Sequence, residues 1–188
     1  GGSLMVTVLM VTLISVIIGM GSSTTGSYII LAVVAAPALI QLGVPEIPAH
    51  LVVFYAACLS NITPPVCVSA FAAAAIAKAD PMKTGFAALK FGTTLVLIPL
   101  SFVYVPELML QGEVYRIVLV CIFYLFGYST LAIAIQGRDF FFGKISTFIR
   151  ILFFITSACF LFPLIYWLKA IGIVLLIFSY VLIKLNRK

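Results

Sequence analysis

The sequence has few charged residues for its length. It contains eleven Lys and Arg and five Asp and Glu among 188 residues, so only 9% of the chain is charged. A soluble globular domain carries roughly 25% charged residues. The hydrophobic share is 64% and the mean hydropathy is +1.31. These values exclude an ordinary soluble domain and indicate an integral membrane protein, with room for about six or seven segments of ~20 residues.

Patterns for metal binding, disulfides and acid–base chemistry are also missing. The four cysteines form no C-x-x-C pair, so neither zinc nor a disulfide framework is indicated. The single histidine, His50, lies at the start of an apolar segment, where we expect an interfacial residue without a functional role. No acidic residue falls in mid-span, which argues against a carboxylate proton relay. We therefore expect no enzyme and no cofactor.

The net charge of +6 does not indicate nucleic-acid binding. The basic residues form no dense patch interleaved with aromatics. They lie instead in short loops and at segment ends, as in membrane proteins.

Two uncharged polar stretches interrupt the apolar sequence. The first reads G-M-G-S-S-T-T-G-S over residues 19–27, and the second reads S-N-I-T-P-P-V over residues 60–66. In lipid, unpaired backbone is tolerated only where it is buried in protein or lines a cavity. Two such interruptions in one chain indicate an ion or substrate site near the middle of the bilayer.

The first stretch favours a re-entrant hairpin over residues 4–42. Its flanking apolar segments, of about 15 residues each, reach only ~22 Å, which is less than the ~30 Å hydrocarbon core. The stretch also lacks the Lys or Arg that a cytoplasmic turn usually carries. The alternative is a short cytoplasmic turn between two full spans, because Gly, Ser and Thr are ordinary turn residues.

The second stretch predicts a discontinuous helix over residues 49–77. Ala49–Leu59 and Cys67–Ala77 are each too short to cross the membrane, but together they make one crossing. Pro64 and Pro65 remove two backbone donors, so carbonyls near them can face a hard cation such as sodium, which prefers oxygen ligands. The alternative is a proline kink in an ordinary helix.

Further spans are expected over residues 86–104, 114–135, 151–167 and 171–183. The basic residues are unevenly divided if residues 4–42 enter and leave on one side of the membrane and each later segment crosses once. Of these basic residues, the side opposite to the one where residues 4–42 enter then holds only Arg116 and Lys169. The first side then holds Lys78, Lys83, Lys90, Arg138, Lys144, Arg150, Lys184, Arg187 and Lys188. This bias predicts that the first side is cytoplasmic.

The order of these motifs resembles the large permease subunit of tripartite ATP-independent periplasmic (TRAP) transporters. The resemblance rests on G-M-G-S-S-T-T at 19–25, A-P-A-L at 36–39, A-H-L-V-V-F-Y at 49–55, S-N-I-T-P-P-V-C-V at 60–68 and V-Y-V-P-E-L at 103–108. More narrowly, the chain is similar to the fused form, in which the small and large membrane subunits share one chain. The resemblance covers roughly residues 4–110.

The resemblance implies the C-terminal part of a longer, multi-pass permease in a bacterial or archaeal cytoplasmic (inner) membrane. The expected fold is all-α, a multi-span helical bundle with a re-entrant hairpin and a discontinuous helix, forming the second inverted repeat of an elevator-type transporter. Residues 1–110 would be the second-repeat transport region, with the hairpin at 4–42, the broken helix at 49–77 and a span at 86–104. Residues 111–188 would be accessory transmembrane helices, and the first repeat and small-subunit helices would lie upstream.

The function implied by the resemblance is sodium-coupled import of a small organic acid. A periplasmic or extracytoplasmic binding protein would deliver this carboxylate, for example a dicarboxylate, and membrane lipid would surround the permease. The implied substrate- and ion-binding residues are Gly19, Gly21, Ser22, Ser23, Thr24, Thr25, Ser60, Asn61, Thr63, Pro64 and Pro65. Ser23, Thr25, Asn61 and Thr63 are the expected sodium ligands. The alternative is a non-transporting membrane scaffold or assembly subunit, in which both interruptions are packing kinks.

Overall fold

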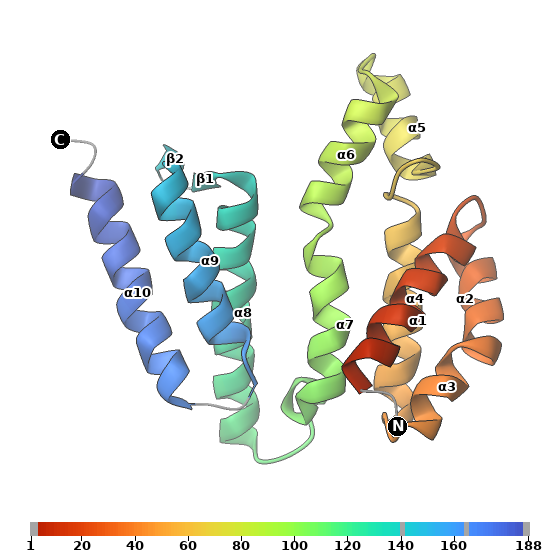
Figure 1. Ribbon diagram of the computed structural model, residues 1–188, viewed down its shortest axis with the longest axis horizontal. Helices are drawn as coiled ribbons and strands as arrows, with labels where there is room; N and C mark the ends of the chain where they lie inside the picture. The colour runs from red at the N-terminus through yellow and green to blue at the C-terminus, as the bar shows by residue number, and fades with distance from the viewer. Residues whose placement is uncertain (1–3, 140–141, 164–165, 186–188) are drawn as a thin grey trace. The chain divides into compact units, whose positions relative to one another are not determined.

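The computed structural model describes residues 4–139, 142–163 and 166–185, which are almost entirely α-helical (Figure 1). The basic residues Arg187 and Lys188 of the expected cytoplasmic tail lie outside the described residues. The chain divides into two units, Gly1–Tyr104 and Val105–Lys188.

The first unit is built around helix α4. Its helices are α1 (Leu4–Gly19), α2 (Thr24–Val34), α3 (Ala36–Gln41), α4 (Glu46–Ser60), α5 (Val68–Ala77), α6 (Pro81–Phe91) and α7 (Thr94–Tyr104). Helices α1, α2, α3 and α7 all pack against α4, and α6 packs against α5. The hairpin arms and the interrupted helix therefore form one packed body.

Small side chains explain why α4 can be surrounded in this way. Its buried residues are Pro48, Ala49, Val52, Val53, Ala56, Ala57, Leu59 and Ser60. Small residues let helix backbones approach closely inside a membrane. One face of α4 packs with Val8 and Leu39 from α1 and α3, and another packs with Leu31 of α2.

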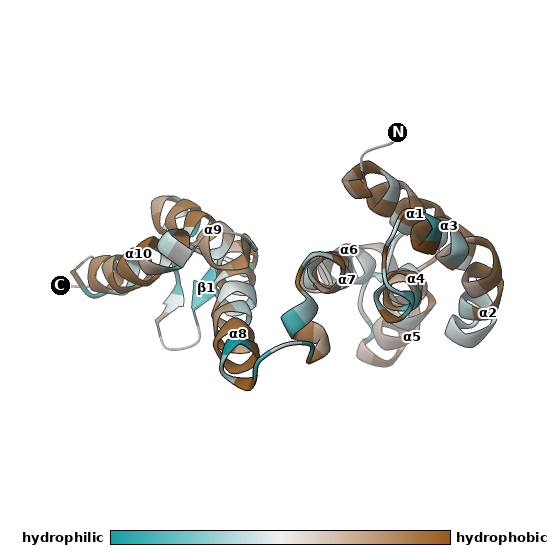
Figure 2. Ribbon diagram, turned by 90° about the horizontal axis from the view of Figure 1, so that it is seen from below, coloured by the Kyte–Doolittle hydropathy of each residue, from teal (hydrophilic) through white to brown (hydrophobic). Residues whose placement is uncertain are grey.

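The helix interruption expected from the second polar stretch is present. Helix α4 ends at Ser60 and α5 begins at Val68, and Figures 1 and 2 show α5 stacked beyond the end of α4. The second hairpin arm is itself divided, because α2 ends at Val34 and α3 begins at Ala36. Pro37 accounts for this division, since its ring removes a backbone donor and clashes with the preceding turn.

The second unit is a helical hairpin with a third helix packed on it. Its elements are η1 (Pro106–Met109), α8 (Val114–Gln136), β1 (Arg138–Asp139), β2 (Gly143–Lys144), α9 (Thr147–Leu161) and α10 (Tyr166–Leu185). Helix α9 packs against both α8 and α10, with Phe153 and Phe160 fully buried. Strands β1 and β2 pair antiparallel between α8 and α9.

Three expected spans have the wrong bounds, and the one expected over 171–183 lies within the longer helix α10, Tyr166–Leu185. The span expected over 151–167 ends early, because α9 stops at Leu161 ahead of Pro163, and Trp167 belongs to α10. Proline biases the residue before it away from helical geometry. The span expected over 86–104 starts earlier, at Pro81, where the Asp80 carboxylate caps the helix by accepting from Lys83 N at 2.8 Å.

Among the residues that the structure describes, four stretches are long and apolar enough to cross a bilayer: Thr24–Gln41, Pro81–Tyr104, Val114–Gln136 and Trp167–Leu185. The shorter apolar helices are Leu4–Gly19, Glu46–Ser60, Val68–Ala77 and Thr147–Leu161. Figure 2 shows hydrophobic colouring along most helices and hydrophilic colouring at β1 and at the start of α8. The architecture is that of a helical membrane protein with spans of unequal length.

Candidate functional site

The expected hairpin tip is a turn between α1 and α2. Helix α1 ends at Gly19 and α2 begins at Thr24. Ser23 is the N-cap of α2, since its Oγ accepts a hydrogen bond from Gly26 N at 3.1 Å. Gly21 has a φ of +86°, a left-handed conformation that glycine adopts without a steric penalty. One glycine and one capping serine therefore shape the turn.

The non-helical backbone is shorter than expected. The expectation of unwound backbone over residues 19–25 and 60–65 is wrong for Gly19, Thr24, Thr25 and Ser60, which are all helical. The Ser23 cap satisfies an N–H of the first turn and so allows α2 to start at once. Thr24 and Thr25 consequently lie on the first turn of a helix.

Serine hydroxyls link the two sides of the tip. Ser22 and Ser27 form a hydroxyl–hydroxyl hydrogen bond in which either side chain can donate. The Ser27 hydroxyl also contacts the Ser23 carbonyl, at 3.0 Å. Among the described residues, the Ser22 and Ser23 side chains hydrogen-bond only within the tip. These two expected site residues are exposed.

The helix interruption is a compact turn. Thr63 Oγ1 donates to Leu59 O at 2.7 Å, and Ser69 N donates to Asn61 O at 3.2 Å. Pro64 and Pro65 are joined by a cis peptide bond. Hydrogen bonds between its two ends thus hold the segment between α4 and α5.

The tip and the interruption meet at two points. A methyl group placed on Gly19 would lie 2.6 Å from Ser60 Oγ and 2.9 Å from Ser60 Cβ, so α1 and α4 touch there and only glycine fits. Asn61 Nδ2 donates to Thr24 Oγ1 at 2.9 Å. Four of the expected site residues are therefore brought together in two pairs, Gly19 with Ser60 and Thr24 with Asn61.

Helix α6 covers the other side of the interruption through two glycines that the sequence reasoning did not single out. A methyl group on Gly85 would lie 2.7 Å from Cys67 Sγ and 3.4 Å from Pro64 Cγ. Gly92 makes a similarly close contact with Ile62. A lone glycine in a helical sequence gives no sign of which segment it faces, so only the tertiary structure identifies these contacts.

A buried serine on α1 was also missed. Ser15 is 0% exposed, and among the described residues its Oγ has no hydrogen-bond partner. It lies four residues before Gly19, on the buried side of α1. An unpaired buried hydroxyl is costly and is often a functional feature.

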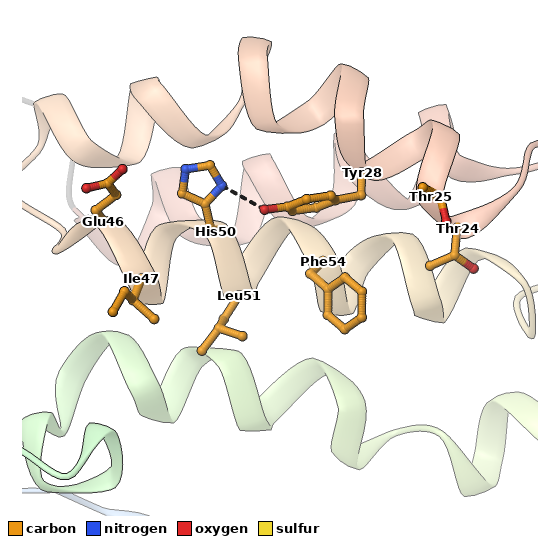
Figure 3. A pocket seen from close by; sticks show the side chains of 8 residues that line it. All are labelled: Thr24, Thr25, Tyr28, Glu46, Ile47, His50, Leu51 and Phe54. Carbon is orange, nitrogen blue, oxygen red and sulfur yellow. Dashed lines mark hydrogen bonds between the residues drawn. The ribbon is translucent and has the colours of Figure 1, made fainter.

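A cleft of about 560 Å³ adjoins the tip along α2 and α4 (Figure 3). Its lining residues are Thr24, Thr25, Tyr28, Glu46, Ile47, His50, Leu51 and Phe54. Tyr28 Oη and His50 Nδ1 are 3.1 Å apart, and the rings of Tyr28 and Phe54 meet edge to face at 5.8 Å. Figure 3 shows the two threonines at one end and Glu46 at the other. His50, expected to be merely interfacial, lines this cleft.

The fold and these paired turns define a class of protein: a multi-pass helical membrane protein whose polar residues meet between a helix hairpin and an interrupted helix. The family described as Tripartite ATP-independent periplasmic transporter, DctM component, matches residues 1–108. This match covers more than half of the chain, which therefore belongs to the DctM family of TRAP transporter permeases and is not an enzyme.

Membership of the family implies two kinds of partner, a TRAP substrate-binding protein and a small membrane subunit. The matched residues include the hairpin tip and the helix interruption but not α8, α9 or α10. A search of curated proteins and a search of solved structures found no match.

Proposed function

We propose that this chain is the second-repeat and C-terminal part of a fused, sodium-coupled permease of the cytoplasmic membrane. It would import a small organic anion, a carboxylate, that an extracytoplasmic binding protein delivers. The observation that carries the proposal is the hydrogen bond between Asn61 and Thr24, which are 37 residues apart in sequence and join the two interruptions. In secondary transporters, interrupted helices supply ion and substrate ligands, and inverted repeats move around that site.

Sodium is proposed to bind where the tip faces the interruption. The Asn61 amide donates both of its hydrogens, one to Thr24 Oγ1 at 2.9 Å and one to Ala57 O at 3.1 Å. Within the part of the chain that the structure describes, no hydrogen bond reaches Asn61 Oδ1, so this oxygen is the atom to face a cation. Hydroxyls of Thr63, Ser23 and Thr25 are the proposed companions, because hard cations prefer oxygen ligands.

The cleft along α2 and α4 is proposed to take the organic anion. Its volume of about 560 Å³ lies within the roughly 300–1,000 Å³ typical of small-molecule sites. The N-terminus of α2 and the hydroxyls of Thr24 and Thr25 favour a carboxylate at the tip end. Glu46 would repel an anion at the opposite end, so the apolar part of the solute would lie beside Phe54 and Leu51. Transport kinetics of variants at Thr25 and Glu46 test this orientation.

The sodium site is tested by Asn61→Ala and Thr63→Ala in the complete transporter. Each variant removes an oxygen ligand, so we expect the sodium concentration for half-maximal uptake to rise about tenfold or more, as the loss of roughly 1.4 kcal/mol requires. Uptake of the solute into proteoliposomes, measured against sodium concentration, gives this value.

Thr156→Ala is the matched control for Thr63→Ala. Thr156 Oγ1 donates to Leu152 O at 2.8 Å, the same bond to the preceding turn that Thr63 makes, but it lies in the second unit. Unchanged sodium dependence in both site variants would overturn the sodium site.

The second candidate function is structural: the hairpin tip and the helix interruption pack against each other and bind no ion. The observation that favours it is that the hydroxyls of Ser60 and Thr63 both donate to carbonyls of α4, Ala57 O and Leu59 O, at 2.7 Å each. Under this alternative the chain would be a membrane scaffold within the transporter. Asn61→Ala and Thr63→Ala would then lower the stability of the protein while leaving its sodium dependence unchanged.

A further inference from the structure

Two basic residues of the second unit line a small cavity. The cavity has a volume of about 250 Å³ and is lined by Tyr115, Arg116, Leu119, Val120, Phe123 and Lys169. It lies between the first turns of α8 and α10, beyond the residues matched by the DctM family. Neither the family match nor the proposed transport site accounts for this pair of cations.

Lys169 is buried to an unusual degree for a lysine. The residue is only 5% exposed, and its Nζ lies 4.9 Å from the centre of the Phe123 ring and 6.0 Å from that of Tyr124. Cation–π contacts of this kind stabilise a buried ammonium group only in part. Burying an ammonium group away from water is costly unless it is paired or bound by a polar group.

The position of both cations on their helices adds to this cost. Arg116 is the third residue of α8, and Lys169 is the fourth residue of α10. A helix N-terminus carries partial positive charge, which disfavours cations and favours anions. Two cations at two helix N-termini around one cavity therefore create a site of positive potential.

Two glutamates of the second unit partly offset this positive potential, but neither lines the cavity. Glu113 pairs with Arg116 at 3.5 Å, and both side chains are exposed. Glu107 attracts Lys169 electrostatically. Arg116 Nε also donates to Tyr115 Oη at 3.0 Å. A guanidinium has five N–H donors, so Arg116 can bind a further acceptor while it keeps these contacts.

We propose that this cavity binds the phosphate of a phospholipid headgroup. Arg and Lys are the side chains that bind phosphate oxygens, and basic pockets between transmembrane helices take lipid headgroups. A volume of about 250 Å³ is below the roughly 300–1,000 Å³ of pockets that enclose whole ligands, and so suits a headgroup with its acyl chains outside.

The surroundings of the cavity favour lipid over a soluble phosphate. Leu119 and Tyr115 line the cavity and are exposed, which gives acyl chains an apolar surface next to the cations. Trp167, two residues before Lys169, is 83% exposed. Exposed Trp and Tyr are typical of the membrane–water interface, where phosphates lie.

The test is native mass spectrometry of the complete permease, extracted from bilayers of phosphatidylethanolamine and phosphatidylglycerol. The wild type should retain a bound phospholipid. Lys169→Gln and Arg116→Gln should each reduce the retained fraction about tenfold, because each removes a charge-assisted contact to phosphate. Arg116 is exposed, so its variant folds even if the buried position does not tolerate glutamine.

Two controls separate charge at this cavity from charge in general. Lys184→Gln, in the last turn of α10, should retain lipid as the wild type does, and Lys169→Arg should retain most of it. Equal retention in all variants would overturn the proposal.

A second arm, with delipidated protein and inorganic phosphate, identifies the source. Binding of phosphate by a wild type that retains no phospholipid would overturn the membrane source. Displacement of bound phospholipid by phosphate would support both the site and its lipid occupant. None of these measurements depends on transport, so they stand or fall independently of the proposed function.

Discussion

At the scale of single residues, the contact between Gly19 and Ser60 decides how closely the hairpin can approach the interrupted helix. The space at Gly19 does not admit a methyl group, because the Ser60 side chain occupies it. Helix propensity alone would favour alanine over glycine by roughly 0.5–1 kcal/mol. Overpacking typically costs about 1–3 kcal/mol, so the steric term dominates at this position.

We therefore predict that Gly19→Ala destabilises the protein by about 1–2 kcal/mol and weakens sodium-dependent uptake. Thermal unfolding in detergent and uptake by proteoliposomes provide the two measurements. The double variant Gly19→Ala/Ser60→Gly moves the methylene group to the other helix and should recover most of the stability. A double variant less stable than both single variants would contradict a direct contact.

At the scale of elements, the cleft has one group at each end that can orient an anion, Thr25 on the first turn of α2 and Glu46 on the first turn of α4. Thr25 is exposed at the tip end of the cleft, and Glu46 lines the far end. We predict that Thr25→Val raises the KM for an anionic solute about tenfold or more, because it keeps the shape of the side chain but removes the hydroxyl. A hydrogen bond to a charged group contributes about 1.5–3 kcal/mol.

Glu46→Gln is predicted to have the opposite effect, since it removes a negative charge from the cleft. The KM should fall or stay the same, while the maximal rate stays close to that of the wild type. Initial uptake rates over a range of solute concentrations measure both values. If Thr25→Val left KM unchanged and Glu46→Gln raised it, the proposed orientation of the anion would be reversed.

Sequence reasoning identified where the elements of the first unit are interrupted, but not which faces meet. Pro64 and Pro65 act locally on the backbone, so the end of α4 could be predicted from them. The start of α2 could not, because a serine such as Ser23 is equally common in a turn and at a helix N-cap. The cleft beside His50 depends on Tyr28 from another helix, and no local pattern encodes that partner.

At the scale of the whole molecule, a comparison of hydrogen exchange in the two units can locate the site where sodium binds. A ligand that binds the native state at a hundred times its Kd stabilises that state by about 2.7 kcal/mol. We predict that sodium slows amide hydrogen exchange by up to about a hundredfold in peptides covering residues 19–27 and 60–69. Peptides from α8, in the second unit, should exchange at an unchanged rate.

Mass spectrometry of exchange in sodium and in potassium, at equal ionic strength, measures this contrast. Protection that is equal in both salts, or that is spread evenly over both units, would contradict a localised sodium site. The N-terminal unit alone carries the expected ligands, and the family match also falls on it almost entirely.

The hydrogen bonds of the Asn61 amide affect which ions can bind between the tip and the interruption. Both hydrogens of Asn61 Nδ2 are already donated, to Thr24 Oγ1 and to Ala57 O, so Oδ1 is the atom of this amide that remains for a ligand. In the proposed site this residue therefore offers no hydrogen to an anion or another acceptor, whereas its Oδ1 can bind a cation. Asn61→Asp would keep the outline of the side chain and add a full negative charge, but a carboxylate cannot donate, so the bonds from this residue to Thr24 Oγ1 and Ala57 O would be lost. The variant would therefore attract cations more strongly and hold the tip to the interruption less firmly.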